Sequence, residues 1–192
     1  MQKQAQAWMK QATQMVTQAG NDPGEFAGWV EQLSLRDPHI AVPAICALQQ
    51  AGSTVIPTLI AGLQHPHTRV RRNCVDIIDH GGYGGDARCI EALLPLLHDP
   101  IPHIRRAVWH TLFCERCQDE TQCEDITPVH LDRVALLIEV GVNDPNPKLR
   151  QQLIADLGAH LSDQRARETL ETIVKTGSDP ALVTTAQQAL MG

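Results

Sequence analysis

A repeated turn is the feature that most constrains the fold of this 192-residue chain. In five segments a proline follows an aspartate or a histidine, with an apolar stretch before the turn and an amphipathic stretch after it. The prolines are Pro38, Pro66, Pro100, Pro145 and Pro180, at intervals of 28, 34, 45 and 35 residues. Intervals of this size are typical of a supersecondary unit repeated along the chain. We therefore expect each unit to be a pair of helices joined by this turn.

The apolar residues after each turn predict which side of the second helix is buried. Val70 and Cys74 are four residues apart and Val75 follows, and the same spacing recurs in the other units. Residues so spaced lie on one face of a helix. The predicted fold is therefore all-α: an α-solenoid of about five helical hairpins with an additional N-terminal helix.

The turns resemble HEAT repeats, in particular the short bacterial HEAT-like type found in PBS-lyase proteins. The resemblance rests on the Asp-Pro turn and on an arginine six residues after the aspartate, as in Asp99/Arg105 and Asp144/Arg150. In that family the two residues form a ladder between neighbouring repeats, and the second helices line a concave surface. By resemblance, Arg71, Arg105 and Arg150 belong to such a ladder.

Three units depart from the family pattern. Pro43 and Thr185 replace the arginine in the first and last units, and His65 replaces the aspartate in the second. The resemblance extends over residues 25–190. It implies a single domain over residues 1–192, with residues 1–20 as an N-terminal capping helix and residues 117–128 as a cysteine-containing insertion.

The repeat register predicts a basic groove. Ala44 and Leu48 and their counterparts in later units should face this groove, away from the core. Its polar members are predicted to be Arg69, Arg72, Asp76, His103, Arg106, His110, Lys148 and Gln151. Arginine pairs well with planar oxyanions, so the groove suits an acidic peptide, a phosphate or a carboxylate ligand. The alternative is that these are solvated helix residues bonded to nearby aspartates.

The insertion carries a second candidate site. His110, Cys114, Cys117 and Cys123 offer four ligands that could close tetrahedrally on zinc, which would pin the loop to the helix before it. Ordinary reduced thiols, or a disulfide such as Cys117 to Cys123, are the alternatives. Elsewhere, Cys46 and Cys74 are predicted at buried helical positions, which favours reduced thiols and a cytoplasmic chain.

Four glycines surround Tyr83 between the second and third units. Such glycines serve a tight turn between repeats, because glycine readily ends a helix. The alternative is a small binding loop that uses His80, Tyr83 and Asp86. No Walker A sequence and no dinucleotide fingerprint is present in the sequence.

Composition excludes several classes of protein. The sequence has only six aromatic residues, which argues against a β-rich fold and an aromatic platform for single-stranded nucleic acid. A net charge of -6 gives no general attraction to a phosphate backbone. The N-terminus lacks the pattern of a secretory signal, and no apolar run has the length of a membrane span.

The sequence thus predicts a non-enzymatic scaffold that needs no cofactor and binds a partner protein, with an acidic segment as the ligand of the basic groove. Two alternatives stay open. One is a metal- or redox-responsive module built on the His110 and cysteine cluster, with zinc as its cofactor. The other is a HEAT-like enzyme, similar to a bilin lyase or a DNA glycosylase. Neither the partner nor the oligomeric state follows from the sequence.

Overall fold

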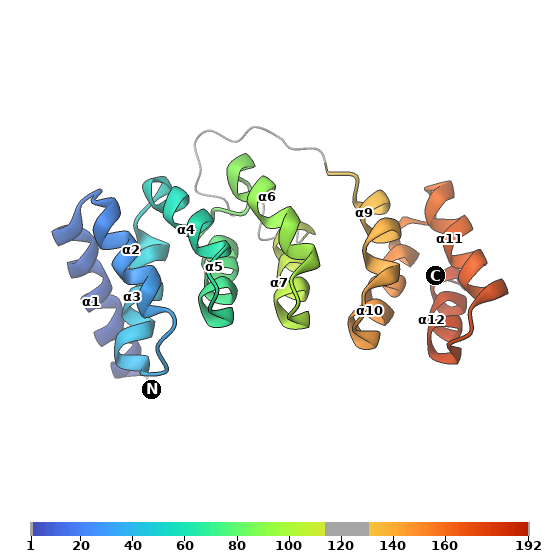
Figure 1. Ribbon diagram of the computed structural model, residues 1–192, viewed down its shortest axis with the longest axis horizontal. Coiled ribbons are helices and arrows are strands. Elements are labelled where there is room, and N and C mark those ends of the chain that lie inside the picture. Colours follow the sequence, from blue (N-terminus) through green and yellow to red (C-terminus); the bar gives the residue numbers. More distant parts are fainter. Residues whose placement is uncertain (1, 114–130, 192) are drawn as a thin grey trace. The chain divides into compact units, whose positions relative to one another are not determined.

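The computed structural model describes residues 2–113 and 131–191, which form a succession of short helices (Figure 1). The α-helices are α1 (Gln2–Ala19), α2 (Pro23–Gln32), α3 (Pro38–Gln50), α4 (Ile56–Leu63), α5 (Thr68–His80), α6 (Ala87–Leu93), α7 (Pro102–Phe113), α9 (Arg133–Glu139), α10 (Pro147–Leu157), α11 (Gln164–Thr176) and α12 (Pro180–Met191). Four 3-10 segments adjoin them, namely Ser53–Val55, Leu94–His98, Gly141–Asn143 and Gly158–His160. These two ranges contain no strand.

Five helical hairpins follow α1, as the repeated turn predicts. The pairs are α2/α3, α4/α5, α6/α7, α9/α10 and α11/α12, and the two helices of each pair contact one another. The five repeat prolines lie in the turn between the two helices or at the start of the second. The predicted all-α solenoid of helical hairpins with an extra N-terminal helix is confirmed.

Short polar side chains fix where several helices begin. Asp37 accepts a hydrogen bond from the His39 N–H at 2.8 Å and caps α3, whose first residue is Pro38. Asp86, Asn146 and Asp163 cap α6, α10 and α11 in the same way. Each such cap satisfies an N–H group that the helix start leaves unpaired and stabilises the helix by about 1 kcal/mol.

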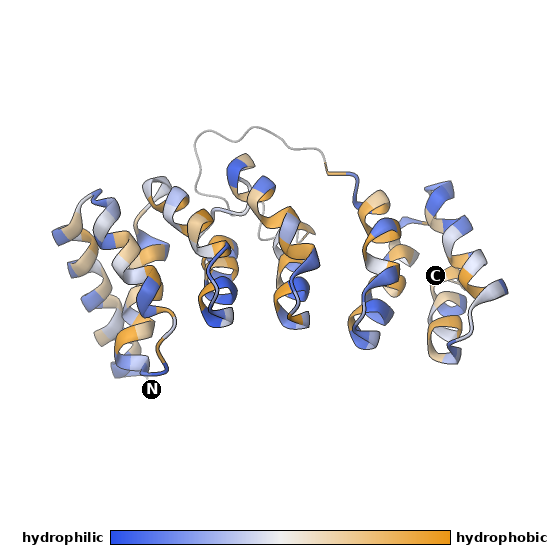
Figure 2. Ribbon diagram, in the orientation of Figure 1, coloured by the Kyte–Doolittle hydropathy of each residue, from blue (hydrophilic) through white to orange (hydrophobic). Residues whose placement is uncertain are grey.

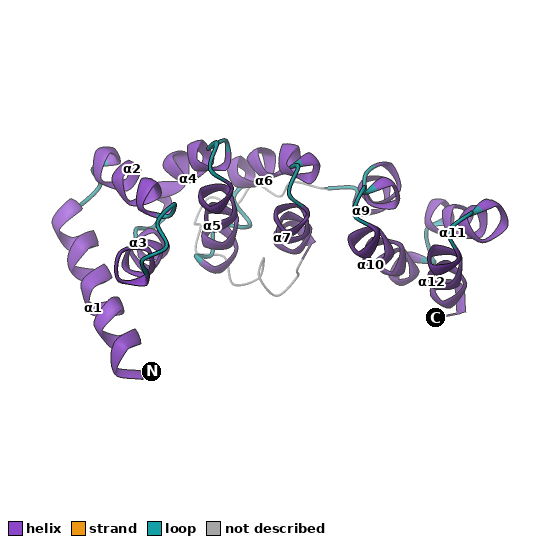
Figure 3. Cartoon of the chain, turned by 60° about the horizontal axis from the view of Figure 1, so that its bottom comes forward, coloured by secondary structure: helices purple, strands orange, loops and turns teal. Residues whose placement is uncertain are grey.

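The first compact unit covers residues 1–129. In its described part, α2, α4 and α6 form one row of helices and α3, α5 and α7 form the other (Figure 3). The core between the rows includes Trp29, Leu59, Cys74, Leu93 and Val108, all buried. Hydrophobic residues alternate with hydrophilic ones along α5 and α7, so each helix has one side for the core and one for solvent (Figure 2).

Helix α1 packs along α3 at the start of this unit. The Thr13 hydroxyl donates to the Gln50 side-chain carbonyl at 3.1 Å, and the rings of Trp8 and His39 meet edge to face at 6.1 Å. Ala12 is the buried residue of α1. The remainder of α1 is mostly exposed, which agrees with its glutamine-rich sequence.

The second compact unit covers residues 130–192. Helix α9 contacts α11, α10 contacts α12, and Leu137, Leu153, Leu157 and Leu170 are buried among them. The single domain expected over residues 1–192 stays a prediction, because residues 114–130 at the boundary of the units lie outside the described ranges.

Within the described ranges, no single helix combines the length and the hydropathy of a membrane span. The pair Pro38–Gln50 and Ser53–Leu63 meets these criteria only when taken together, and it bends by 114° at the break.

Candidate functional site

The turn aspartates organise the polar contacts of the repeats. Asp99 accepts the Ile101 N–H at 2.8 Å, and Asp144 and Asp179 accept the N–H group two residues later at similar distances. Asp37 does the same in the first repeat. The aspartate therefore recurs because its carboxylate closes the turn, whatever else it contacts.

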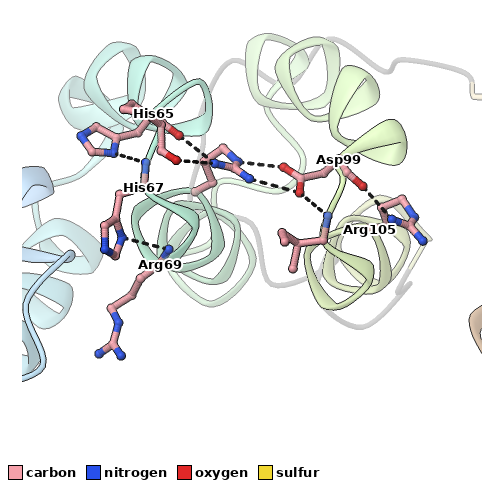
Figure 4. Close-up of polar contacts among 8 residues, drawn as sticks. His65, His67, Arg69, Asp99 and Arg105 are labelled. Carbon is pink, nitrogen blue, oxygen red and sulfur yellow. Dashed lines mark hydrogen bonds and ion pairs between the residues drawn. The ribbon is translucent and has the colours of Figure 1, made fainter. Parts of the chain in front are cut away.

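His65 replaces this aspartate in the second repeat. Its Nδ1 accepts the His67 N–H at 3.0 Å, and Nδ1 of His67 in turn accepts the Arg69 N–H at 3.2 Å (Figure 4). A ring nitrogen that accepts a hydrogen bond carries no proton, so both rings have their proton on Nε2. The two neutral imidazoles thus take over the role of the carboxylate at this turn.

Arg71 joins two neighbouring repeats. Its Nε lies 2.7 Å from Asp99 Oδ2 and its Nη2 lies 3.2 Å from Asp99 Oδ1, a bidentate pair in which both side chains are largely buried. Its Nη1 also donates to the carbonyls of His65 and Pro66 (Figure 4). Arg71 thereby closes its own turn and holds the next one.

Arg105 and Arg150 repeat part of this arrangement. Each donates from Nη1 to the carbonyl of the turn aspartate six residues earlier, at 2.7 Å. In the second unit, Nη2 of Arg150 lies 3.9 Å from Asp179 Oδ2 of the following repeat. Arg71 and Arg150 thus approach the turn aspartate of the following repeat, as expected of the structural ladder to which the sequence assigned them, and Arg105 binds the carbonyl of its own turn.

The cationic face of the first unit is formed by Arg69, Arg72, His103 and Arg106, which we call the basic strip. Arg72 donates from Nε to Asp76 Oδ2 at 2.8 Å and from Nη1 to the His103 carbonyl at 2.7 Å. Arg69 donates to the Leu35 carbonyl, and its side chain points away from the Arg71–Asp99 pair (Figure 4). The side chains of His103 and Arg106 are exposed on α7.

The sequence allowed two interpretations of these residues, either as ligand-binding groups or as solvated residues bonded to aspartates, and each fits part of the basic strip. Asp76 neutralises Arg72, as expected of a helix residue bonded to a nearby aspartate. The carbonyl contact to His103 fixes the Arg72 guanidinium across the space between α5 and α7. Arg106, by contrast, has no ion pair to a carboxylate of the described residues. The charge available to a ligand therefore comes mainly from Arg106 on α7 and Arg69 on α5.

Lys148 and Gln151 belong to the second unit. Lys148 is exposed near the start of α10, and the Gln151 amide donates to the Thr185 hydroxyl on α12 at 3.0 Å. They are therefore not part of the basic strip, whose residues belong to the first unit.

The first repeat contributes no exposed residues of this kind, which corrects the predicted register. Ala44 and Leu48, expected to face the groove, are fully buried. Helix α1 packs along α3, whose buried residues are shifted to the face that corresponds to Arg72 and Asp76 in α5. The N-terminal helix therefore covers the start of the predicted groove.

The glycine loop is held by buried side chains. The Tyr83 hydroxyl donates to the carbonyls of Leu48 and Gln49, at 3.0 and 3.1 Å. Asp86 is buried, caps α6 and binds the Arg88 guanidinium at 2.8 Å. Of the three predicted loop ligands only His80 is exposed. These contacts favour the tight turn over a binding loop.

A buried carboxylate beside this loop is absent from the sequence-based predictions. Asp79 is buried, its Oδ2 lies 3.5 Å from His110 Nε2 and 3.6 Å from His80 Nδ1, and its Oδ1 has no hydrogen bond in the described part of the chain. Helical spacing could have indicated its burial, because Asp79 follows the buried Val75 by one helical turn. His110, predicted as a groove residue or a metal ligand, lies next to the Asp79 carboxylate.

The predicted zinc ligands fall mostly outside the described residues, since Cys114, Cys117 and Cys123 lie in 114–130. Over 2–113 and 131–191, no group of three or more His, Cys, Asp or Glu side chains is arranged to hold a metal ion. Cys46 and Cys74 are free thiols, and burial raises the pKa of Cys74 to about 12. Cys74 is fully buried as predicted, whereas Cys46 is partly exposed.

Comparison with protein families agrees with the geometry of the first unit. Residues 56–125 match the family described as HEAT repeats, and this range includes α4 to α7 with the Arg71–Asp99 pair. The predicted resemblance is thereby confirmed over residues 56–125. HEAT repeats generally mediate protein interactions and are usually not enzymes. A search of curated proteins found no significant match to the chain.

Proposed function

We propose that this chain, which carries HEAT repeats over residues 56–125, is a protein-interaction scaffold whose basic strip binds an acidic segment of a partner protein. The observation that supports this most is that the His103 carbonyl on α7 holds the Arg72 guanidinium, while Arg106 on the same helix is exposed. The two arginines come from the second helices of successive repeats, so they present donors at the spacing of the array.

A carboxylate-bearing peptide suits this strip better than a phosphate backbone. Tight binding to a phosphate backbone draws on many cations at once, whereas here Asp76 neutralises Arg72 and leaves Arg69 and Arg106 for single carboxylates. Arginine forks pair with carboxylates through two parallel hydrogen bonds, which gives directional binding at an exposed site.

The test uses a fluorescein-labelled hexaglutamate peptide as the probe, and its anisotropy as the readout, with the full chain at low and at physiological ionic strength. We expect saturable binding that weakens as salt is added, because exposed charges are screened. Arg106→Glu should lower the affinity about tenfold or more, since it replaces an attractive contact with a repulsive one.

Lys175→Glu is the matched control, because it makes the same change of charge at an exposed residue of α11 outside the strip. If both variants lose affinity equally, attraction to the strip is excluded in favour of general charge. Absence of saturable binding by the unmodified chain would also contradict the proposal. Circular dichroism of each variant verifies that the helices are retained.

A further inference from the structure

The second unit contains a cavity of about 520 Å³ between α9 and α11. Its apolar lining comes from both helices and from the 3-10 segment after α9, and consists of Ala135, Ile138, Val142 and Ile173. The volume lies within the range of about 300–1,000 Å³ that is usual for ligand sites. Helices α9 and α11 are the first helices of their hairpins, whereas the basic strip of the first unit lies on second helices.

Carboxylates dominate the rim of the α9–α11 groove. Glu139 on α9 and Glu168 on α11 line it and are exposed. Glu168 accepts a hydrogen bond from Gln164 at 2.6 Å, which is a neutral partner and leaves its charge uncompensated.

Arg165, the cation in the lining, is already paired twice. Its Nη1 lies 2.7 Å from Asp132 Oδ2 and its Nη2 lies 2.7 Å from Asp163 Oδ2. Two carboxylates thus face one guanidinium, so this cluster adds a net negative charge to the rim. An anionic ligand would find no available cation among these lining residues.

We propose that the α9–α11 groove binds an amphipathic helix of a partner protein, with apolar side chains in the cavity and lysine or arginine at its flanks. Two adjacent helices with an apolar space between them suit a third helix, which anchors through side chains at positions i, i+3, i+4 and i+7. The acidic rim selects basic flanks. The acidic segment proposed for the basic strip would be repelled here, so the two sites take partners of opposite charge.

The probe is a synthetic helical peptide labelled with fluorescein, with leucines at i, i+3, i+4 and i+7 and lysines at the remaining positions. A scrambled peptide of the same composition lacks the apolar face, and a third peptide has glutamate in place of lysine. Anisotropy is measured with the full chain. We expect saturable binding of the first peptide and at least tenfold weaker binding of the other two.

Two variants separate the groove from general charge. Glu168→Lys should weaken binding of the lysine peptide about tenfold, because a cation then stands on the rim. Glu171→Lys, on the same helix but outside the lining, is the matched control and should change it less than twofold. Thr172→Trp places a large ring over the cavity from an exposed residue and should also weaken binding while circular dichroism stays unchanged.

The proposal is overturned if the scrambled peptide binds as tightly as the amphipathic one, since attraction to an acidic protein then suffices. Equal losses in the Glu171→Lys control and in Glu168→Lys would lead to the same conclusion. Absence of binding by any peptide also overturns it. None of these outcomes depends on the hexaglutamate experiment, which concerns the first unit.

Discussion

The guanidinium of Arg71 and the carboxylate of Asp99 form a bidentate pair between the turns of successive repeats, with atoms 2.7 and 3.2 Å apart. Because the side chains are 13% and 4% exposed, the pair is shielded from solvent. Removal of one partner leaves a largely buried charge without compensation, which typically costs about 3–5 kcal/mol.

Asp99→Ala should therefore lower the free energy of unfolding by about 3 kcal/mol or more. A double-mutant cycle with Arg71→Ala, measured by urea denaturation, should give a coupling of about 1–3 kcal/mol. Asp37→Ala is the control, because Asp37 closes the same kind of turn and is exposed. Its loss should cost only about 1 kcal/mol. Equal effects of the two aspartate variants would show that Asp99 acts as a turn residue alone.

Because the thiol of Cys74 is buried, we expect the stability of the fold to decrease at alkaline pH. Burial raises the pKa of its thiol from 9.0 to about 12, so the folded chain keeps a proton that the unfolded chain loses. Stability from this residue is complete below about pH 9 and falls as the pH rises toward 12, by about 1.4 kcal/mol per pH unit.

The measurement is urea unfolding at neutral pH and near pH 10.5, for the unmodified chain and for Cys74→Ala. The variant should lose stability at neutral pH through the cavity that it leaves, yet it should show a smaller decrease between the two pH values. A decrease of the same size in both proteins would assign the alkaline effect to other groups.

We expect the hydroxyl group of Tyr83 to contribute to the packing of the glycine loop. Its hydroxyl hydrogen bonds to carbonyls in the last turn of α3, where the helix itself supplies no donor. Tyr83→Phe should lower the free energy of unfolding by about 1 kcal/mol. Tyr83→Leu also removes the ring from a fully buried site, so its cost should be larger. Thermal unfolding of the two variants compares these effects, and an unchanged Tyr83→Phe protein would contradict the role of the hydroxyl.

We expect Arg165 to lower the pH at which two neighbouring aspartates become protonated. Its hydrogen bonds hold the pKa values of Asp132 and Asp163 below their ordinary values. The corresponding stability is present above the ordinary carboxyl range and is lost as the pH falls through the lowered pKa values. In Arg165→Gln, NMR titration of the side-chain carboxyls should show both aspartates protonating at higher pH. Asp156, whose pKa is raised by burial, is the control, because Arg165 is not among the causes of its shift.

The hairpins could be predicted because their cause is local. A proline after a capping residue, followed by apolar residues at helical spacing, is sufficient to indicate a turn and the buried side of the next helix. The ladder residues were also predictable, because Arg71 and Arg105 stand at fixed offsets from the turn.

The less predictable features depend on contacts distant in sequence. Ala44 and Leu48 are buried because α1 packs along α3, and nothing in their own repeat indicates this. The α9–α11 groove likewise arises from two helices about thirty residues apart. Arg72 was placed on the correct helix, but its bond to the His103 carbonyl depends on how closely α5 and α7 approach.

The neutral turn at His65 has a counterpart one repeat earlier. Pro43 stands six residues after Asp37, at the position that Arg71 has relative to His65. The first repeat therefore lacks the arginine of the ladder. The second repeat has His65 in place of the turn aspartate with which that arginine would pair. The two departures are therefore complementary. Restoring aspartate at 65 alone would create an acid without its arginine, and restoring arginine at 43 alone would create a cation without its acid. The first two repeats therefore lack both members of the ion pair that Arg71 and Asp99 form between the next two, and neither Pro43 nor His65 leaves a buried carboxylate or guanidinium without its partner.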